Sequence, residues 1–101
     1  MGGFRDRYRA VSLAASALTV KAGSVVVLTG RTAPLATWTA TAVAQRLVRG
    51  SWRGVVKAAL SSRGHYRLVA PVLRGAQTLR VVVRSPAHAP TPSRTVVIHG
   101  T

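Results

Sequence analysis

The fold class is decided by residues 78–85, Thr-Leu-Arg-Val-Val-Val-Arg-Ser. Successive side chains of a β-strand point to opposite faces of the sheet, so an alternation with period two indicates a half-buried strand. The inward positions predicted from this alternation are Leu79, Val81 and Val83. The outward positions are Arg80, Val82 and Arg84. The segment therefore predicts a strand with one face on a core and the other in water.

Short runs rich in β-branched residues continue outward from this segment in both directions, separated by turn signals about 8–12 residues apart, as in sandwiches and barrels. The expected strands are 11–14 continued by 18–20 as a first strand broken in two, 24–29 ending at Gly30, 39–48, 52–60, 65–70, 78–85 and 94–100. Proline-containing loops are expected at 32–37 and 86–93. Only residues 39–48 are ambiguous, because their alanines permit a helix. The branched side chains of Thr39, Thr41 and Val43 and the lack of a cap favour a strand, which forms a hairpin with 52–60.

These elements predict an all-β domain, a sandwich of about seven antiparallel strands that requires no helix. The chain of 101 residues is one domain's length, and its core must be thin because only five residues are aromatic. Trp52 is expected to fill the core, with a loss of about 3–5 kcal/mol for Trp52→Ala. Tyr66 is expected to point inward with its hydroxyl at the rim. The chain has no cysteine, so neither disulfides nor thiolate metal sites are expected.

The sequence resembles the bacterial immunoglobulin-like modules found in large secreted and cell-surface proteins of high-GC organisms. The resemblance runs from Val11 to Thr101 and rests on five groups of residues. They are Ala22-Gly23 with Val26, Leu28 and Gly30; Gln45-Arg46 with Gly50-Ser51-Trp52 and Val55-Val56; Gly64-His65-Tyr66-Arg67-Leu68 with Ala70-Pro71; Leu79-Arg80-Val81; and Val96-Val97-Ile98. It implies an extracellular or cell-surface module that holds neighbouring domains apart or lies against anionic cell-wall polymer.

The chain departs from that family in two respects. Such modules usually balance acids and bases, and they usually occur in longer chains behind a secretion signal. Here residues 1–9 are interpreted as a basic tail or linker and residues 10–101 as the domain. The first twenty residues imitate a signal peptide, but Ser12, Ser16 and Thr19 interrupt the apolar stretch. No apolar run of 18 or more residues predicts a transmembrane segment.

The charge balance is the most unusual property of the sequence. Fifteen Lys and Arg residues face a single acid, Asp6, for a formal net charge of +14. Such a charge points to an anionic partner, which is nucleic acid, anionic cell-wall polymer or lipid, or an acidic protein neighbour. A GC-rich codon bias explains the arginines equally well, and outward arginines also keep strand edges from aggregating. The candidate anion contacts are Arg5, Arg7 and Arg9 on a basic arm and Arg67, Arg80 and Arg84 on a sheet face.

Three function classes follow from the charge and the resemblance. The first is a structural or adhesive module that contacts anionic polymer, and the second is a small nucleic-acid-binding β-protein that makes non-specific phosphate contacts. A subunit packed against acidic neighbours is a third. Arg80→Ser is expected to leave stability unchanged or to improve it, because Arg80 is predicted to be solvated and repelled by other cations.

Catalysis is not expected from this composition. One carboxylate excludes paired-carboxylate hydrolysis, and there is no Gly-x-Ser-x-Gly elbow and no glycine-rich phosphate loop with a lysine. His65, His88 and His99 lack the spacing of a zinc site. The sequence therefore predicts a non-enzymatic protein without metal or cofactor.

Overall fold

A computed structural model describes residues 6–7, 10–33, 40–86 and 88–101, which form an all-β structure without a helix. The strands are β1 (Asp6–Arg7), β2 (Ala10–Val11), β3 (Ala14–Ala15), β4 (Thr19–Val20), β5 (Val25–Ala33), β6 (Thr41–Val48), β7 (Ser51–Ala59), β8 (His65–Pro71), β9 (Gly75–Ser85), β10 (His88–Pro92) and β11 (Val96–Gly100).

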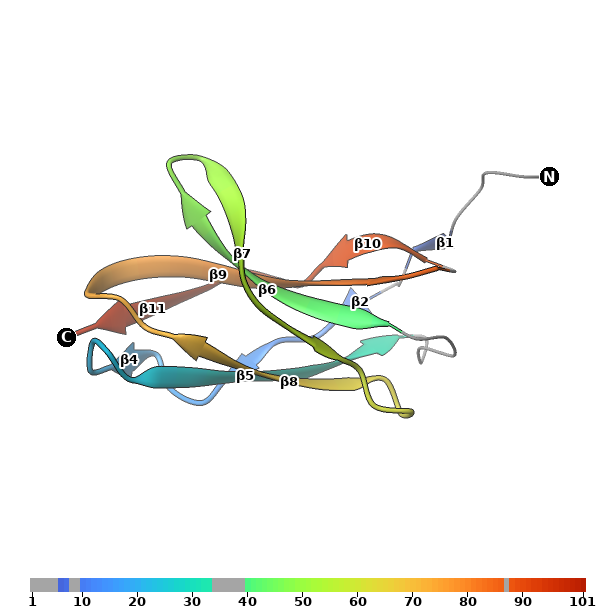
Figure 1. Cartoon of the computed structure of the whole chain (residues 1–101), viewed down its shortest axis with the longest axis horizontal. Helices are drawn as coiled ribbons and strands as arrows, with labels where there is room; N and C mark the ends of the chain where they lie inside the picture. Colours follow the sequence, from blue (N-terminus) through green and yellow to red (C-terminus); the bar gives the residue numbers. More distant parts are fainter. Residues whose placement is uncertain (1–5, 8–9, 34–39, 87) are drawn as a thin grey trace.

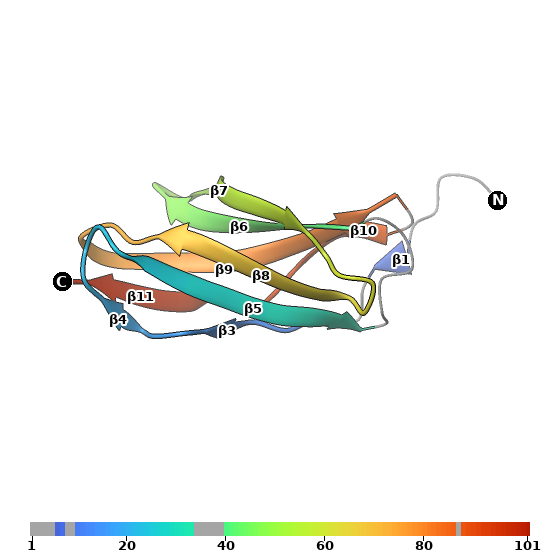
Figure 2. The same ribbon diagram turned by 60° about the horizontal axis from the view of Figure 1, so that its bottom comes forward.

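The strands form two sheets that face each other (Figures 1 and 2). The first sheet has seven strands. In it β9 pairs on one edge with β10 and β11 and on the other with β6, which pairs with β7. The two short strands β1 and β4 add to β10 and β11. The second sheet has four strands, with β2, β3 and β8 all pairing with β5. The chain crosses between the sheets from β5 to β6, from β7 to β8 and from β8 to β9. The two-layered all-β architecture expected from the sequence is thus observed.

The core lies between the sheets and is built from the alternating positions of the long strands. Its largest fully buried side chains are Val26, Leu28, Leu68, Leu79, Val81, Val83 and Ile98. Burial of a side chain of this kind contributes about 1.5–3 kcal/mol. The inward positions predicted on β8, β9 and β11 are confirmed. Val82, predicted to be outward and wet, is only 7% exposed, because Val43 of β6 and Pro92 of β10 flank it on the outer face.

The first strand is broken, as predicted, and its pieces join different sheets. β2 and β3 run antiparallel to β5, whereas β4 lies parallel to β11 in the first sheet. Upstream of them β1 pairs in parallel with β10, through Asp6 with His88 and Arg7 with Ala89. Residues 6–7 of the segment interpreted as a tail therefore belong to the first sheet.

Several boundaries differ from the prediction. β9 begins at Gly75 rather than at Thr78, and β11 begins at Val96 rather than at Arg94. β5 does not end at Gly30 but continues to Ala33 and forms seven residue pairs with β8. Residues 88–92, expected in a loop because of their prolines, form the strand β10. Strand β6 confirms the strand predicted over 39–48 from Thr41 onward, and Thr39 lies outside the described residues, as do positions 34–37 of the predicted loop.

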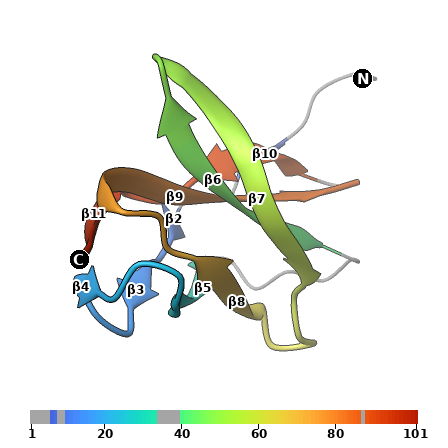
Figure 3. The same cartoon turned by 60° about the vertical axis from the view of Figure 1, so that its left-hand side comes forward.

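Trp52 does not fill the core, which corrects the prediction made for it. Its partner on β6 is Leu47, and its half-buried ring lies on the outer face of the first sheet under the guanidinium of Arg80. Figure 3 shows why: the far half of the β6–β7 hairpin projects away from the space between the sheets. Small and aliphatic side chains and the ring of Tyr66 fill that space instead.

Candidate anion-binding site

Of the six arginines predicted as anion contacts, the three whose side chains the structure describes, Arg67, Arg80 and Arg84, do not share one surface. Arg5 and Arg9 lie outside the described residues, and the backbone of Arg7 belongs to β1. Arg67 is exposed on β8 of the second sheet, whereas Arg84 is exposed and Arg80 half-buried on β9 of the first. Because the outer faces of two packed sheets point in opposite directions, the predicted face shared by Arg67, Arg80 and Arg84 is wrong.

Arg80 is held by neighbouring side chains. Its guanidinium carbon lies 4.2 Å from the centroid of the Trp52 ring. Its Nε donates a hydrogen bond of 2.8 Å to Oε1 of Gln45 on β6. A cation–π contact and a hydrogen bond of this kind fix the side chain to its own sheet. Arg80 therefore stabilises the outer face of the first sheet.

Arg67 instead belongs to a cluster that the sequence did not predict. The antiparallel register of β5 and β8 sets Arg31 directly opposite His65 and Thr29 directly opposite Arg67. All four side chains point away from the core, since they alternate with buried neighbours along both strands. Arg31 and His65 are thus a direct cross-strand pair, with Cβ atoms about 4.5–5.5 Å apart, and Arg67 is a diagonal neighbour of Arg31, at about 7–8 Å. The three side chains therefore start from one region of the outer face.

This cluster borders an open depression with a volume of about 700 Å³. Its polar lining also includes the hydroxyl-bearing residues Ser12, Thr29 and Ser61, and its apolar lining includes Ala59 and Leu60 at the end of β7. Hydroxyl and guanidinium donors beside one another are groups that bind phosphate or carboxylate oxygens. The depression therefore suits an anionic ligand.

Part of the lining of the depression is fixed by a close approach between β5, β8 and Ser12, which follows β2. The Tyr66 hydroxyl donates a hydrogen bond to the carbonyl oxygen of Ser12. Burial raises the pKa of that hydroxyl, although Arg94 acts in the opposite direction, so the phenol remains a donor. A Cβ on Gly30 would lie 2.6 Å from the Tyr66 hydroxyl and would also strike the Ser12 carbonyl. Gly30 is therefore required by this approach. Gly30 is predicted from the sequence at the end of a strand, whereas a glycine within a strand is typical of a close backbone approach.

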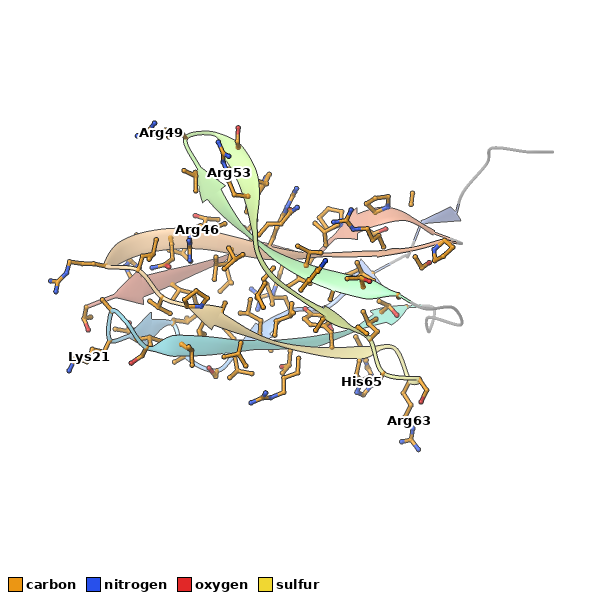
Figure 4. All side chains as sticks on the ribbon, viewed as in Figure 1. Lys21, Arg46, Arg49, Arg53, Arg63 and His65 are labelled. Atoms are coloured by element: carbon orange, nitrogen blue, oxygen red, sulfur yellow. The ribbon has the colours of Figure 1, made fainter. Side chains whose placement is uncertain are left out.

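Ser12 and Ser61 fix the rim of the depression, because their hydroxyls accept hydrogen bonds from backbone amides. The Ser12 amide donates to the carbonyl of Arg31 at 2.9 Å, and the Arg31 amide donates to the Ser12 hydroxyl at 2.9 Å. In the turn before β8, the Ser61 hydroxyl accepts the amides of Arg63 and His65 at 3.3 and 3.2 Å. Figure 4 shows Arg63 and His65 together at this end of the molecule, at the lower right, with Arg63 beyond the turn.

No acidic residue lines the depression. Because Asp6 is the only acid in the sequence, the cations of the rim have no carboxylate side chain within the described second sheet to neutralise them. At a screening length of about 8 Å, each still contributes to the potential of its neighbours. The site is therefore electropositive.

The other half of the same outer face is apolar. Continuing along the register, Val27 lies opposite Val69 and Val25 lies opposite Pro71. Val25 and Val69 are both exposed. The outer face of the second sheet thus changes from cationic at one end to apolar at the other.

Within residues 6–7, 10–33, 40–86 and 88–101, no three His, Cys, Asp or Glu side chains gather in a way that would hold a metal ion. A membrane-crossing helix, long and apolar enough, is likewise not found among these residues. No family model and no curated protein sequence matches the chain.

Proposed function

We propose that the chain is an immunoglobulin-like, non-catalytic module of an extracellular or cell-surface protein, and that it binds anionic cell-wall polymer through the depression bordered by Arg31, His65 and Arg67. The observation that carries the ligand class is the register of β5 and β8, which gathers two arginines and a histidine without a compensating carboxylate.

The strand order supports the immunoglobulin-like part of the proposal. An immunoglobulin-type sandwich sets strands A, B and E in one sheet and C, F and G in the other, with C′ added beside C in variable-type domains. Here β2 and β3, β5 and β8 occupy the places of A, B and E. The places of C′, C, F and G are occupied by β7, β6, β9 and β11. One feature differs: antibody-like domains carry a tyrosine near the start of strand F, whereas β9 contains no tyrosine.

The ligand is tested with a soluble poly(glycerol phosphate) chain, titrated against Arg31→Ser/Arg67→Ser. The matched control is Lys21→Ser/Arg74→Ser, which removes two exposed cations from turns away from the depression. Hydrogen bonds to charged groups contribute about 1.5–3 kcal/mol each, so the site variant should bind at least about tenfold more weakly. The control should stay within about threefold, because it alters only the long-range field.

Equal losses in both double variants would show that binding follows net charge rather than this site. Nucleic acid is the competing ligand with the same phosphate chemistry, so duplex and single-stranded DNA of equal charge are titrated in parallel. Single-strand binding usually relies on exposed aromatic platforms. Tyr66 is buried and Trp52 is covered by Arg80. Tighter binding of either DNA than of the polymer would overturn the polymer assignment.

A further inference from the structure

The free end of the β6–β7 hairpin combines apolar and basic side chains on an element that leaves the body of the molecule. Pairing of β6 with β9 ends at Arg46, while pairing of β6 with β7 continues to Val48 and Ser51. Figures 1 and 3 show this end of the hairpin standing clear of both sheets. Its base is fixed, because Nη2 of Arg46 donates to the Pro71 carbonyl at 3.1 Å.

Apolar side chains emerge on both faces of this hairpin end. Leu47 is 40% exposed and lies opposite Trp52, whereas Val48 is 36% exposed and points to the other face. A flat protein surface would cover only one of these faces. A fluid apolar interface, into which the tip inserts, would cover both.

Arginines surround the apolar residues. Arg80 lies over Trp52 on one face, and the register places Arg53 on the face of Val48. Arg49 occupies the turn itself, and Figure 4 shows it at the apex with Arg53 behind it. Leu47, Val48 and Trp52 thus lie between the arginine at the apex and Arg53 and Arg80 nearer the body. Apolar side chains interspersed with arginines suit the boundary between acyl chains and phosphate headgroups at the surface of an anionic lipid layer.

The backbone at Arg49 supports a role for that side chain. Arg49 has φ 51° and Gly50 has φ 79°, the positive pair required by a type I′ hairpin turn. Asn is favoured at the first of these positions, and arginine is uncommon there. This conformation costs free energy for a residue other than glycine, so its presence at an exposed apex indicates a function for the Arg49 side chain.

The edge of the hairpin argues against a second copy of the chain as the partner. The β6–β7 pairing is irregular between Ala44 and Gln45, and β7 carries the exposed Lys57. Bulges and lysines on an edge strand disfavour pairing with another strand.

From these features we propose that the tip formed by Leu47, Val48, Arg49, Trp52 and Arg53 docks the protein on the surface of an anionic lipid bilayer, independently of the depression on the second sheet.

The test is partition of the intact chain onto vesicles of phosphatidylcholine containing about one third phosphatidylglycerol, compared with pure phosphatidylcholine vesicles, because anionic headgroups attract basic segments. The tip variant is Leu47→Ser/Arg49→Asn. The matched control is Leu73→Ser/Arg74→Asn, which makes the same two changes at the exposed turn before β9. Both are checked for an unchanged thermal transition, and the Asn is compatible with the turn.

We expect the tip variant to lose at least tenfold in partition onto anionic vesicles and the control to lose less than twofold. The partition of Arg31→Ser/Arg67→Ser onto anionic vesicles should decrease no more than that of Lys21→Ser/Arg74→Ser. This comparison separates the lipid proposal from the polymer site. Equal losses in the tip and control variants, or equal partition of the unmodified chain onto neutral vesicles, would overturn the proposal. So would loss of DNA binding or of self-association, instead of vesicle binding, in the tip variant.

Discussion

Tyr66 stabilises the fold in two ways. Its ring is buried in the core, and its hydroxyl donates a hydrogen bond to the backbone carbonyl of Ser12. At neutral pH, Tyr66→Phe removes one hydrogen bond and leaves the Ser12 carbonyl without it. We expect a loss of about 0.5–1.5 kcal/mol in the free energy of unfolding, measured by urea denaturation.

The pH dependence has a definite sign. The folded-state pKa of Tyr66 is raised above the ordinary value of 10.0, so above pH 10 the unfolded state ionises while the folded state keeps its proton. The stability that Tyr66 contributes is therefore complete below pH 10 and is lost as the pH rises above it, with a slope of up to about 1.4 kcal/mol per pH unit. Tyr66→Phe should lack this decline. Parallel pH profiles of the two proteins from pH 8 to 11.5 would contradict the assignment.

The contact between Arg80 and Trp52 changes two expectations. Since Trp52 is half-buried on an outer face, Trp52→Ala should cost about 1–2 kcal/mol, less than truncation in a core. Arg80→Ser should cost a similar amount, because it loses the stacking and the bond to Gln45. A double-mutant cycle on the free energy of unfolding should show a coupling of about 0.5–1.5 kcal/mol between them. A coupling of zero would mean that the stacking contributes nothing.

At the scale of the element, one hydroxyl replaces a backbone acceptor where β10 ends and β11 has not yet begun. Ser93 lies between the two strands, and its hydroxyl accepts the amide of the buried Val81 at 2.9 Å, while its own amide donates to the Val81 carbonyl at 2.7 Å. Ser93→Ala should leave the Val81 amide unsatisfied and cost about 1–3 kcal/mol in chemical denaturation. Ser62→Ala in the exposed turn before β8 is the control and should stay within about 0.5 kcal/mol.

The elements differ in how far the sequence could predict them. Alternation along β8, β9 and β11 is local, so their inward sides were predicted correctly. β10 was missed because prolines normally interrupt sheets, yet Pro92 pairs with Val82 in a short strand whose other partner is only β1.

The candidate site was beyond local patterns. Arg31 meets His65 only because β5 pairs with β8, and the strands between them in sequence lie in the other sheet. The alternation along a strand predicts that these arginines point outward, but it does not predict which sheet carries them. The prediction therefore groups Arg67 with Arg80 and Arg84, although β8 and β9 lie in different sheets. Sequence period sets the face of a residue, whereas strand partners are set by the packing of the whole chain.

The whole molecule carries its +14 charge on a body with extents of 50 × 28 × 17 Å. At 10 mM salt the screening length is about 30 Å, so most of the charges repel one another, whereas at 150 mM it is about 8 Å and only neighbours interact. The free energy of unfolding should therefore rise by about 1 kcal/mol or more between these salt concentrations. A stability that falls with added salt would show that attractive contacts of the arginines outweigh their repulsion.

The screening of charge repulsion by salt and the binding of an anion to the depression can be distinguished by comparing two anions at equal ionic strength. Millimolar sulfate that occupies the depression should raise the melting temperature above the value in sodium chloride of equal ionic strength, because a ligand of the folded state stabilises it by mass action. The excess should disappear in Arg31→Ser/Arg67→Ser and persist in Lys21→Ser/Arg74→Ser, since only the first pair borders the depression. Sulfate also stabilises proteins by exclusion from their surface, but exclusion acts on both variants alike. An excess that persists equally in both would assign the stabilisation to the overall charge and leave the depression without a specific anion.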